Sequence, residues 1–293
     1  MSKLQWDLTG ERYFELGVSR GVLYPMSSNG AYPLGVAWNG LTAVNKNPSG
    51  AEPNDMWADN IKYASIRGAE QFGGTIEAFT YPDEFNECNG KKLLAPGVYA
   101  GQQRRAPFGM SFRSEIGNDV DPEVGFKLHV IYGATVSPSE EAYATINESP
   151  EGATLSFEMT TTPVEISKPG FRPTAALEID SRTVDPDRME ELLEILHGST
   201  SANARLPLPD EILSLLEGDA VVPTAPTFVA ATGVLTIPTV AGVEYKVNGV
   251  TAPAGAKSPA PGGTLLQVTA HSLSGYSIAP ETPRTWAFVS TLV

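Results

Sequence analysis

The sequence contains little of the material from which most catalytic and metal sites are built. Its 293 residues include one cysteine, Cys88, and three histidines, and only 18% of them are charged. A single cysteine excludes an intrachain disulfide framework and fits a reducing compartment. The thiol could be a nucleophile, but no histidine or asparagine is placed to suggest a partner, so an inert, half-buried thiol is the simpler interpretation.

Long apolar runs and basic residues are also scarce. The first 17 residues lack the basic start and apolar run of a secretory signal, and no stretch approaches the roughly 20 apolar residues of a membrane helix. Lys and Arg number 20 against 34 Asp and Glu, which gives a net charge of −14. This balance argues against ordinary nucleic-acid binding, which places Lys and Arg on phosphates.

Recognisable catalytic motifs are missing as well. The sequence has no nucleophile elbow, zinc-protease helix, phosphate loop or dinucleotide fingerprint. None of His129, His197 and His271 has a second ligand at metal spacing. The run 118–121 faintly resembles a calcium loop, but it lacks the glycine and the closing glutamate, so a polar turn is expected. We therefore predict no catalytic residue, no metal, no cofactor and no enzyme activity.

Glycine and proline, by contrast, are abundant, with 28 and 24 copies, and 41% of the residues are hydrophobic. The apolar content is enough for a real core. Asn-Gly pairs at 29–30, 39–40 and 89–90 are typical of tight turns. Together these features predict a mainly β protein with many turns and few helices.

Alternation of apolar and polar residues predicts three strands in the first part of the chain, over 74–81, 126–132 and 153–164. In two of them one face is polar and carries an acidic residue, Glu77 or Glu158. Each of these carboxylates is expected on an exposed strand face, where simple solvation is the default interpretation.

Helices are few. Asp185-Pro186 is a good helix start, and apolar residues at helical spacing predict a helix that ends at Gly198. A second helix is expected over 209–218, and one helical turn over 82–88. The apolar stripes of the two longer helices are expected to bury on their own domain or, alternatively, on a neighbouring subunit.

Charge is unevenly distributed along the chain. Residues 1–222 carry 17 basic and 32 acidic side chains, whereas residues 223–293 carry three basic and two acidic ones. The proline-containing run near this change predicts a linker over 219–226 between a domain at 1–218 and a module at 227–293. Short predicted strands in the module favour a small β-sandwich.

Several long strings resemble the major tail (tail tube) proteins of long-tailed bacteriophages. The likeness runs from about residue 30 to 165 and continues more weakly through the helices to 217, while the last segment resembles the immunoglobulin-like modules appended to such proteins. The strings are GVAWNGLT at 35–42, PSGAEP at 48–53, ADNIKY at 58–63, TIEAFTYPDEF at 75–85, GQQRR at 101–105, LHVIYGA at 128–134, NESPE at 147–151 and TPV at 162–164.

This resemblance implies a tail-tube β-sandwich or barrel with flanking helices, plus a small C-terminal immunoglobulin-like sandwich. It further implies a structural virion protein of the tail, made in the host cytoplasm, whose hexameric rings stack into a tube. Other tail proteins (tape measure, tail terminator, and baseplate or tip) would be its partners. Genomic DNA would pass through the channel without specific binding.

Two sets of residues follow as expectations from the resemblance. Glu77 and Glu158 are expected to face the lumen, because an acidic wall repels phosphates and does not hold the DNA it conducts. A long polar loop over 45–56 is expected to join one ring to the next. The loop residues singled out are Asn45, Lys46, Asn47, Glu52, Asn54 and Asp55.

Two other interpretations stay open. The chain could be a carbohydrate-binding or adhesion protein, with a host-surface glycan bound to Tyr245, Tyr276 and Trp286, although core or turn packing suits each aromatic better. The basic pairs 91–92 and 104–105 could bind carboxylates of another copy, although a solvated surface is the simpler expectation for either.

Overall fold

The computed structural model describes residues 4–50, 52–141 and 154–292. Strands account for 44% of the protein and helices for 9%, which confirms the mainly β prediction. The chain divides into two compact units: Met1–Asp180 with Glu194–Asp210, and Ser181–Leu193 with Glu211–Val293. The sequence string at 147–151, residue 51 and the first residue of the strand predicted over 153–164 lie outside the described residues.

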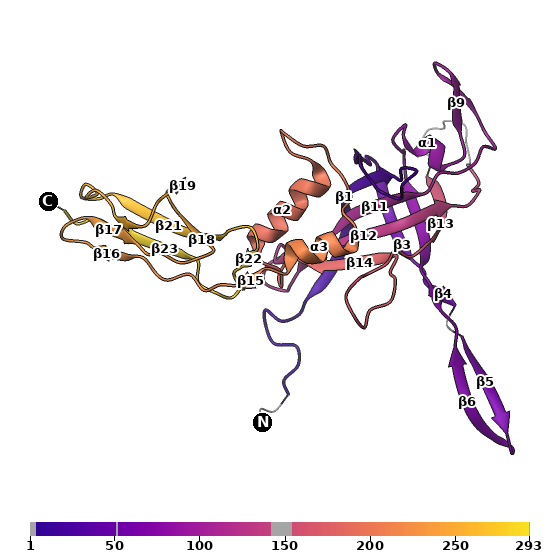
Figure 1. Cartoon of the computed structure of the whole chain (residues 1–293), viewed down its shortest axis with the longest axis horizontal. Coiled ribbons are helices and arrows are strands. Elements are labelled where there is room, and N and C mark those ends of the chain that lie inside the picture. The colour runs from indigo at the N-terminus through magenta and orange to yellow at the C-terminus, as the bar shows by residue number, and fades with distance from the viewer. Residues whose placement is uncertain (1–3, 51, 142–153, 293) are drawn as a thin grey trace. The chain divides into compact units, whose positions relative to one another are not determined.

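The first unit is built on an eight-stranded antiparallel sheet (Figure 1). Its strands follow the order β2-β1-β11-β12-β13-β8-β3, and β14 also pairs with β12. The strands are β1 (Phe14–Pro25), β2 (Val36–Ala37), β3 (Leu41–Lys46), β8 (Gly73–Ala78), β11 (Phe108–Gly117), β12 (Gly125–Val136), β13 (Leu155–Thr161) and β14 (Ala176–Asp180).

Strand β12 changes its partner along its length. Its first half pairs with β14 and its last three residues pair with β13. Gly133 lies at the change with a φ of +58°, and a Cβ there would come within 2.3 Å of the Thr162 carbonyl oxygen. Glycine is therefore required where the strand turns from one partner to the other.

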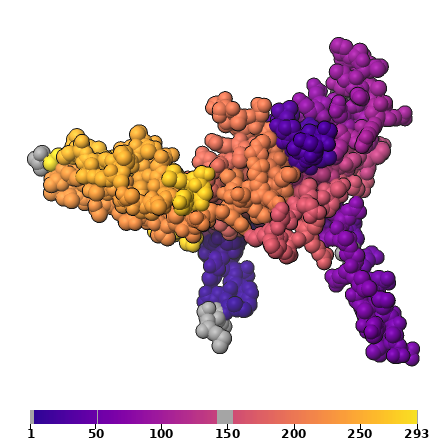
Figure 2. Space-filling view, in the orientation of Figure 1, coloured from indigo at the N-terminus to yellow at the C-terminus, as the bar shows by residue number. Residues whose placement is uncertain are grey.

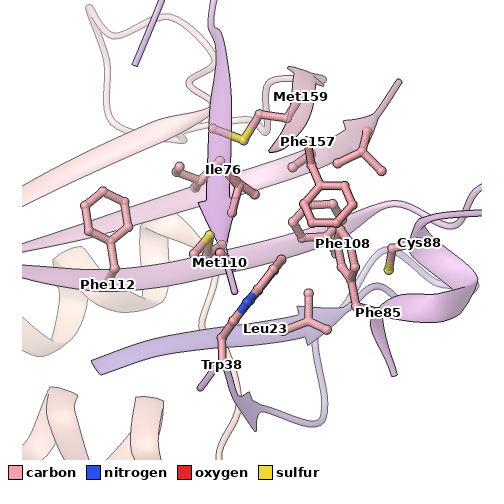
Figure 3. Packing of buried hydrophobic residues seen from close by; sticks show 14 of the residues in the cluster. Leu23, Trp38, Ile76, Phe85, Cys88, Phe108, Met110, Phe112, Phe157 and Met159 are labelled. Atoms are coloured by element: carbon pink, nitrogen blue, oxygen red, sulfur yellow. The ribbon is translucent and has the colours of Figure 1, made fainter. Parts of the chain in front are cut away.

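The core of this unit lies on the inner face of the curled sheet (Figure 3). The predicted alternation in β13 is confirmed, since Leu155, Phe157 and Met159 are buried and the residues between them are exposed. The short helix α1 (Phe85–Cys88) covers the core, within the turn predicted over 82–88. The ring of Phe85 lies 4.7–5.5 Å from those of Trp38, Tyr81, Phe108 and Phe157.

Two further helices follow the sheet, and both agree with the sequence prediction. They are α2 (Pro186–His197) and α3 (Pro209–Leu216). Asp185 caps α2 by accepting a bond from the Asp187 backbone N–H at 3.1 Å. Along the apolar stripes Met189, Leu192, Leu196 and Ile212 are buried within the chain itself.

The second unit contains two small sheets that share one core, as expected of a β-sandwich. One sheet is β16-β17-β20 and the other is β19-β18-β21-β23. The strands are β16 (Thr227–Val229), β17 (Val234–Ile237), β18 (Val243–Val247), β19 (Val250–Thr251), β20 (Gly255–Ala256), β21 (Leu265–Ser272) and β23 (Thr285–Val289).

The segment expected as a linker, 219–226, is bonded to this sandwich. Strand β15 (Asp219–Ala220) pairs in parallel with β22 (Tyr276–Ser277). The Thr224 backbone N–H donates to the Tyr245 hydroxyl at 2.9 Å, and that hydroxyl donates to the Thr224 carbonyl at 2.7 Å. These bonds restrain the segment, so it is less mobile than a free linker would be.

The aromatic cluster around Phe85 generates a stability prediction. Phe85→Ala should lower the free energy of unfolding by about 3–5 kcal/mol, because it removes a fully buried ring and leaves a cavity. Phe79→Ala is the matched control, since that ring is 58% exposed and should cost about 0.5 kcal/mol or less. Denaturant unfolding of both variants checks this, and equal losses would contradict the assigned core.

Candidate functional site

The outer face of strands β3, β8 and β13 forms a polar surface in which residues of the three strands lie directly opposite one another. Glu77 pairs with Ser156, and Thr75 pairs with both Glu158 and Asn45. Because opposed residues of antiparallel strands share a face, these side chains point away from the core. Register adds Ala43 of β3, Thr160 of β13 and, in the neighbouring strand β12, Thr135 to this face.

We call this set of eight residues the polar face. It carries two carboxylates, and no Lys or Arg is among its members. Glu158 is exposed, while Glu77 is partly buried and accepts a bond from the Asn45 side-chain amide at 3.3 Å. The two glutamates predicted from sequence therefore lie on adjacent strands of one surface.

The prediction of a loop over 45–56 is wrong, because much of this range forms strands. Within the described residues of that range, β3 is followed by β4 (Ser49–Gly50) and β5 (Pro53–Ala58). Strand β5 pairs with β6 (Ile61–Arg67), and β4 pairs with β7 (Glu70–Gln71). The cause is the turn at Asp59-Asn60, where both residues have a positive φ of 50–60°, as a tight hairpin turn requires.

Strands β5 and β6 form an arm, 53–67, that extends from the sheet (Figures 1 and 2). One side of the arm is held by polar contacts: Asp55 accepts bonds from Ser65 at 2.7 Å and from Lys62 at 2.8 Å. These two bonds hold the pKa of the Asp55 carboxyl below its ordinary value.

The other side of the arm is mainly apolar. Register places Met56 opposite Ala64, Ala58 opposite Ile61, and Ile66 opposite Asn54. Met56, Ile61 and Ile66 are 49%, 64% and 58% exposed. An isolated two-stranded hairpin is marginally stable in water, so this side is a candidate contact surface.

The six residues predicted for ring stacking therefore do not lie together in one loop. Glu52, Asn54 and Asp55 are exposed and lie in the arm or directly before it. Asn45 belongs to the polar face, and Asn47, which is exposed, follows β3. Lys46 points to the opposite, inner face.

Lys46 belongs to a polar cluster that the sequence did not predict. Its ammonium lies 2.7 Å from Nδ1 of His129 and also bonds to Glu178. His129 stacks on Phe112 with ring centroids 4.7 Å apart, so the cluster adjoins the core. Five strands supply its members: Glu15, Lys46, Ser114, Lys127, His129 and Glu178.

The bonds in this cluster assign the proton of His129. An ammonium can only donate, so Nδ1 accepts from Lys46 and Nε2–H donates to the Ser114 hydroxyl at 2.8 Å. Ser114 in turn donates to Glu15 at 2.6 Å. Burial and the Lys46 charge both lower the pKa of His129, which keeps the ring neutral.

This arrangement differs from a catalytic triad. A nucleophilic serine needs a histidine whose far nitrogen faces a carboxylate, which stabilises the imidazolium form. Here the far nitrogen bonds to an ammonium at 2.7 Å, which opposes that charge, and the Glu178 carboxylate lies farther away at 3.6 Å. The cluster is therefore suited to joining strands at the end of the core rather than to nucleophilic chemistry.

The structure also shows the surroundings of the other residues that the sequence analysis considered as functional. Cys88 is fully buried, and burial raises the pKa of its thiol to about 12. In 118–121 the Asn118 side-chain oxygen accepts the backbone N–H groups of Val120 and Asp121, as in a polar turn. Within the described ranges, no group of three acidic, His or Cys side chains could hold a metal, and no helix is long and apolar enough to cross a membrane.

The aromatics considered for glycan binding do not form an exposed platform. Tyr245 is 3% exposed and belongs to the core of the sandwich. Trp286 packs against that core, and its ring centroid lies 6.2 Å from that of Tyr245. Tyr276 is partly buried in β22.

Glu15 generates a pH prediction. Bonds from Lys127 and Ser114 lower its pKa from 4.5 to about 2, so its stabilising effect is present above pH 4.5 and is lost as the pH falls toward 2. Glu15→Gln should therefore reduce the unfolding free energy at pH 7, and its difference from wild type should shrink between pH 5 and pH 2. Denaturant unfolding across this range measures it, with Glu123→Gln as control; a difference independent of pH would contradict the assignment.

Comparisons of the chain with protein-family models and with curated protein sequences found no match.

Proposed function

We propose that this protein is a structural subunit whose copies form hexameric rings that stack into the tail tube of a bacteriophage. The observation that carries the proposal is the arm, which exposes an apolar side that one copy does not cover. The sequence strings that resemble tail tube proteins support it, because they cover most of β8, including Glu77, and the start of β6 in the arm.

The polar face supports a channel-lining role. Duplex DNA carries one negative charge per roughly 1.7 Å of its axis, so a wall with Lys or Arg would bind it and slow its passage. The polar face combines Glu77 and Glu158 with small neutral side chains. Such a wall leaves the phosphates to mobile counterions and does not hold the genome.

Within this proposal the second unit is a surface module on the outer wall of the tube, in the virion tail. The tape measure, tail terminator and baseplate or tip proteins are the proposed partners of the tube. A host-surface glycan as ligand of the module has less support, since Tyr245 lies in the core.

Negative-stain microscopy of the purified chain tests the proposal. We expect rings or tubes of constant diameter at high protein concentration. A strictly monomeric species at every concentration would contradict it.

The arm generates a variant prediction. Met56→Ser/Ile61→Ser/Ile66→Ser should prevent rings from stacking into tubes while the thermal melting temperature stays near the wild-type value, because these side chains are exposed in one copy. The matched control is Val250→Ser/Leu265→Ser/Val289→Ser, which replaces apolar residues of the second unit that are at least half exposed. Tubes that form normally from the arm variant would show that this apolar side of the arm does not join rings.

The polar face generates a second variant prediction. Glu77→Lys/Glu158→Lys should make assembled tubes retain duplex DNA in a salt-dependent manner and should slow DNA release from virions, because each change places an ammonium on the wall. Co-sedimentation of DNA with tubes measures retention, and Glu244→Lys/Glu281→Lys gives the same charge change in the second unit. Intact tubes with unchanged retention and release would remove the channel-lining assignment.

A further inference from the structure

The two basic pairs of the sequence meet at one pocket of the first unit. Lys91 and Lys92 follow α1, and Arg104 and Arg105 come further along the chain. All four, together with Glu87, line a pocket of about 360 Å³. A chain with a net charge of −14 thus gathers four cations in one place.

Backbone bonds hold these two segments together. The Gln103 N–H donates to the Gly90 carbonyl at 2.9 Å, and the Ala106 N–H donates to the Glu87 carbonyl at 3.1 Å. The position of the pocket is therefore set by the main chain and does not depend on the conformation of long side chains.

The four cations divide into two that are fixed within the chain and two that are exposed. Lys91 forms an ion pair with Glu141 at 2.9 Å, and Arg105 donates to the Asn89 side-chain oxygen at 3.1 Å. Lys92 and Arg104 are exposed at the rim. The pocket is thus preorganised and presents positive charge to a group from outside.

An exposed apolar hairpin adjoins the pocket. Strands β9 (Lys92–Ala95) and β10 (Val98–Ala100) form a separate two-stranded sheet that begins at the pocket residue Lys92. Their large side chains are turned to solvent: Leu93, Leu94, Val98 and Tyr99 are 56%, 75%, 50% and 43% exposed. Apolar area beside a charged pocket is typical of a protein contact surface.

We propose that this surface, the β9–β10 hairpin with the pocket beside it, docks against a second copy of this chain, whose carboxylates enter the pocket. This rests on the proposed ring assembly and names a contact within it. The partner is a second copy because the chain itself supplies the matching charge, for example in the exposed turn that contains Asp121 and Glu123. Apolar contact would give affinity, and the cations would set the register between copies.

The test uses sedimentation velocity to measure how the Lys92→Glu/Arg104→Glu variant assembles. We expect the protein concentration at which half of the chain is assembled to rise about tenfold or more, because like charges then face each other. Lys168→Glu/Arg172→Glu is the matched control, since it makes the same charge change at exposed positions of the same unit. Assembly equal to wild type, or equal losses in both variants, would overturn the proposal.

A second measurement does not depend on the folding of a variant. Rings formed from unlabelled and isotopically labelled wild-type chain are treated with a zero-length carbodiimide crosslinker, which joins amines to carboxylates in contact. Mixed-isotope peptides that contain Lys92 are expected, and their absence from crosslinked rings would overturn the inference alone. A wild-type chain that never assembles would instead defeat the proposed function, and the inference with it.

Discussion

The structure of the first unit depends on the alternating burial of strands β8 and β13. Every second residue of these strands is committed to the core, so the residues between them must all face the other way. A slip of one position would expose Ile76 and Phe157 and would bury Glu77 and Glu158. The composition of the polar face is therefore fixed by the same packing that stabilises the sheet.

Several exposed surfaces of the first unit lie outside this core. The core packs around α1 and includes no residue of the arm or of the β9–β10 hairpin, whose large apolar side chains are exposed. Their exposure leaves them available for contacts between copies. In the proposed tube, the arm joins rings, the hairpin with its basic pocket joins neighbours, and the polar face lines the channel.

Local pattern was enough to predict some of these features and not others. Alternation predicted β8 and β13 and placed Glu77 and Glu158 on wet faces, and an Asp-Pro start predicted α2. The polar residues of the range 45–56 predict a loop and give no pattern for β4 and β5. The Asp59-Asn60 turn is nevertheless a signal for a hairpin. The cluster around His129 draws on five strands, and the basic pocket joins two separate segments through backbone bonds. Contacts between residues that are far apart in the sequence produce no periodic pattern, so the sequence alone does not predict them.

The most direct measurement of the channel-lining role is the access of reagents to the polar face in assembled tubes. The chain has one native thiol, Cys88, which is fully buried, so a Glu158→Cys variant offers a single reactive site. If the polar face lines a closed channel, a small maleimide should label assembled tubes while a bulky polymer-linked maleimide labels only the unassembled chain; Val250→Cys in the second unit should react with both reagents in both states. Equal labelling of Glu158→Cys by the bulky reagent in intact tubes would contradict a polar face enclosed by the tube.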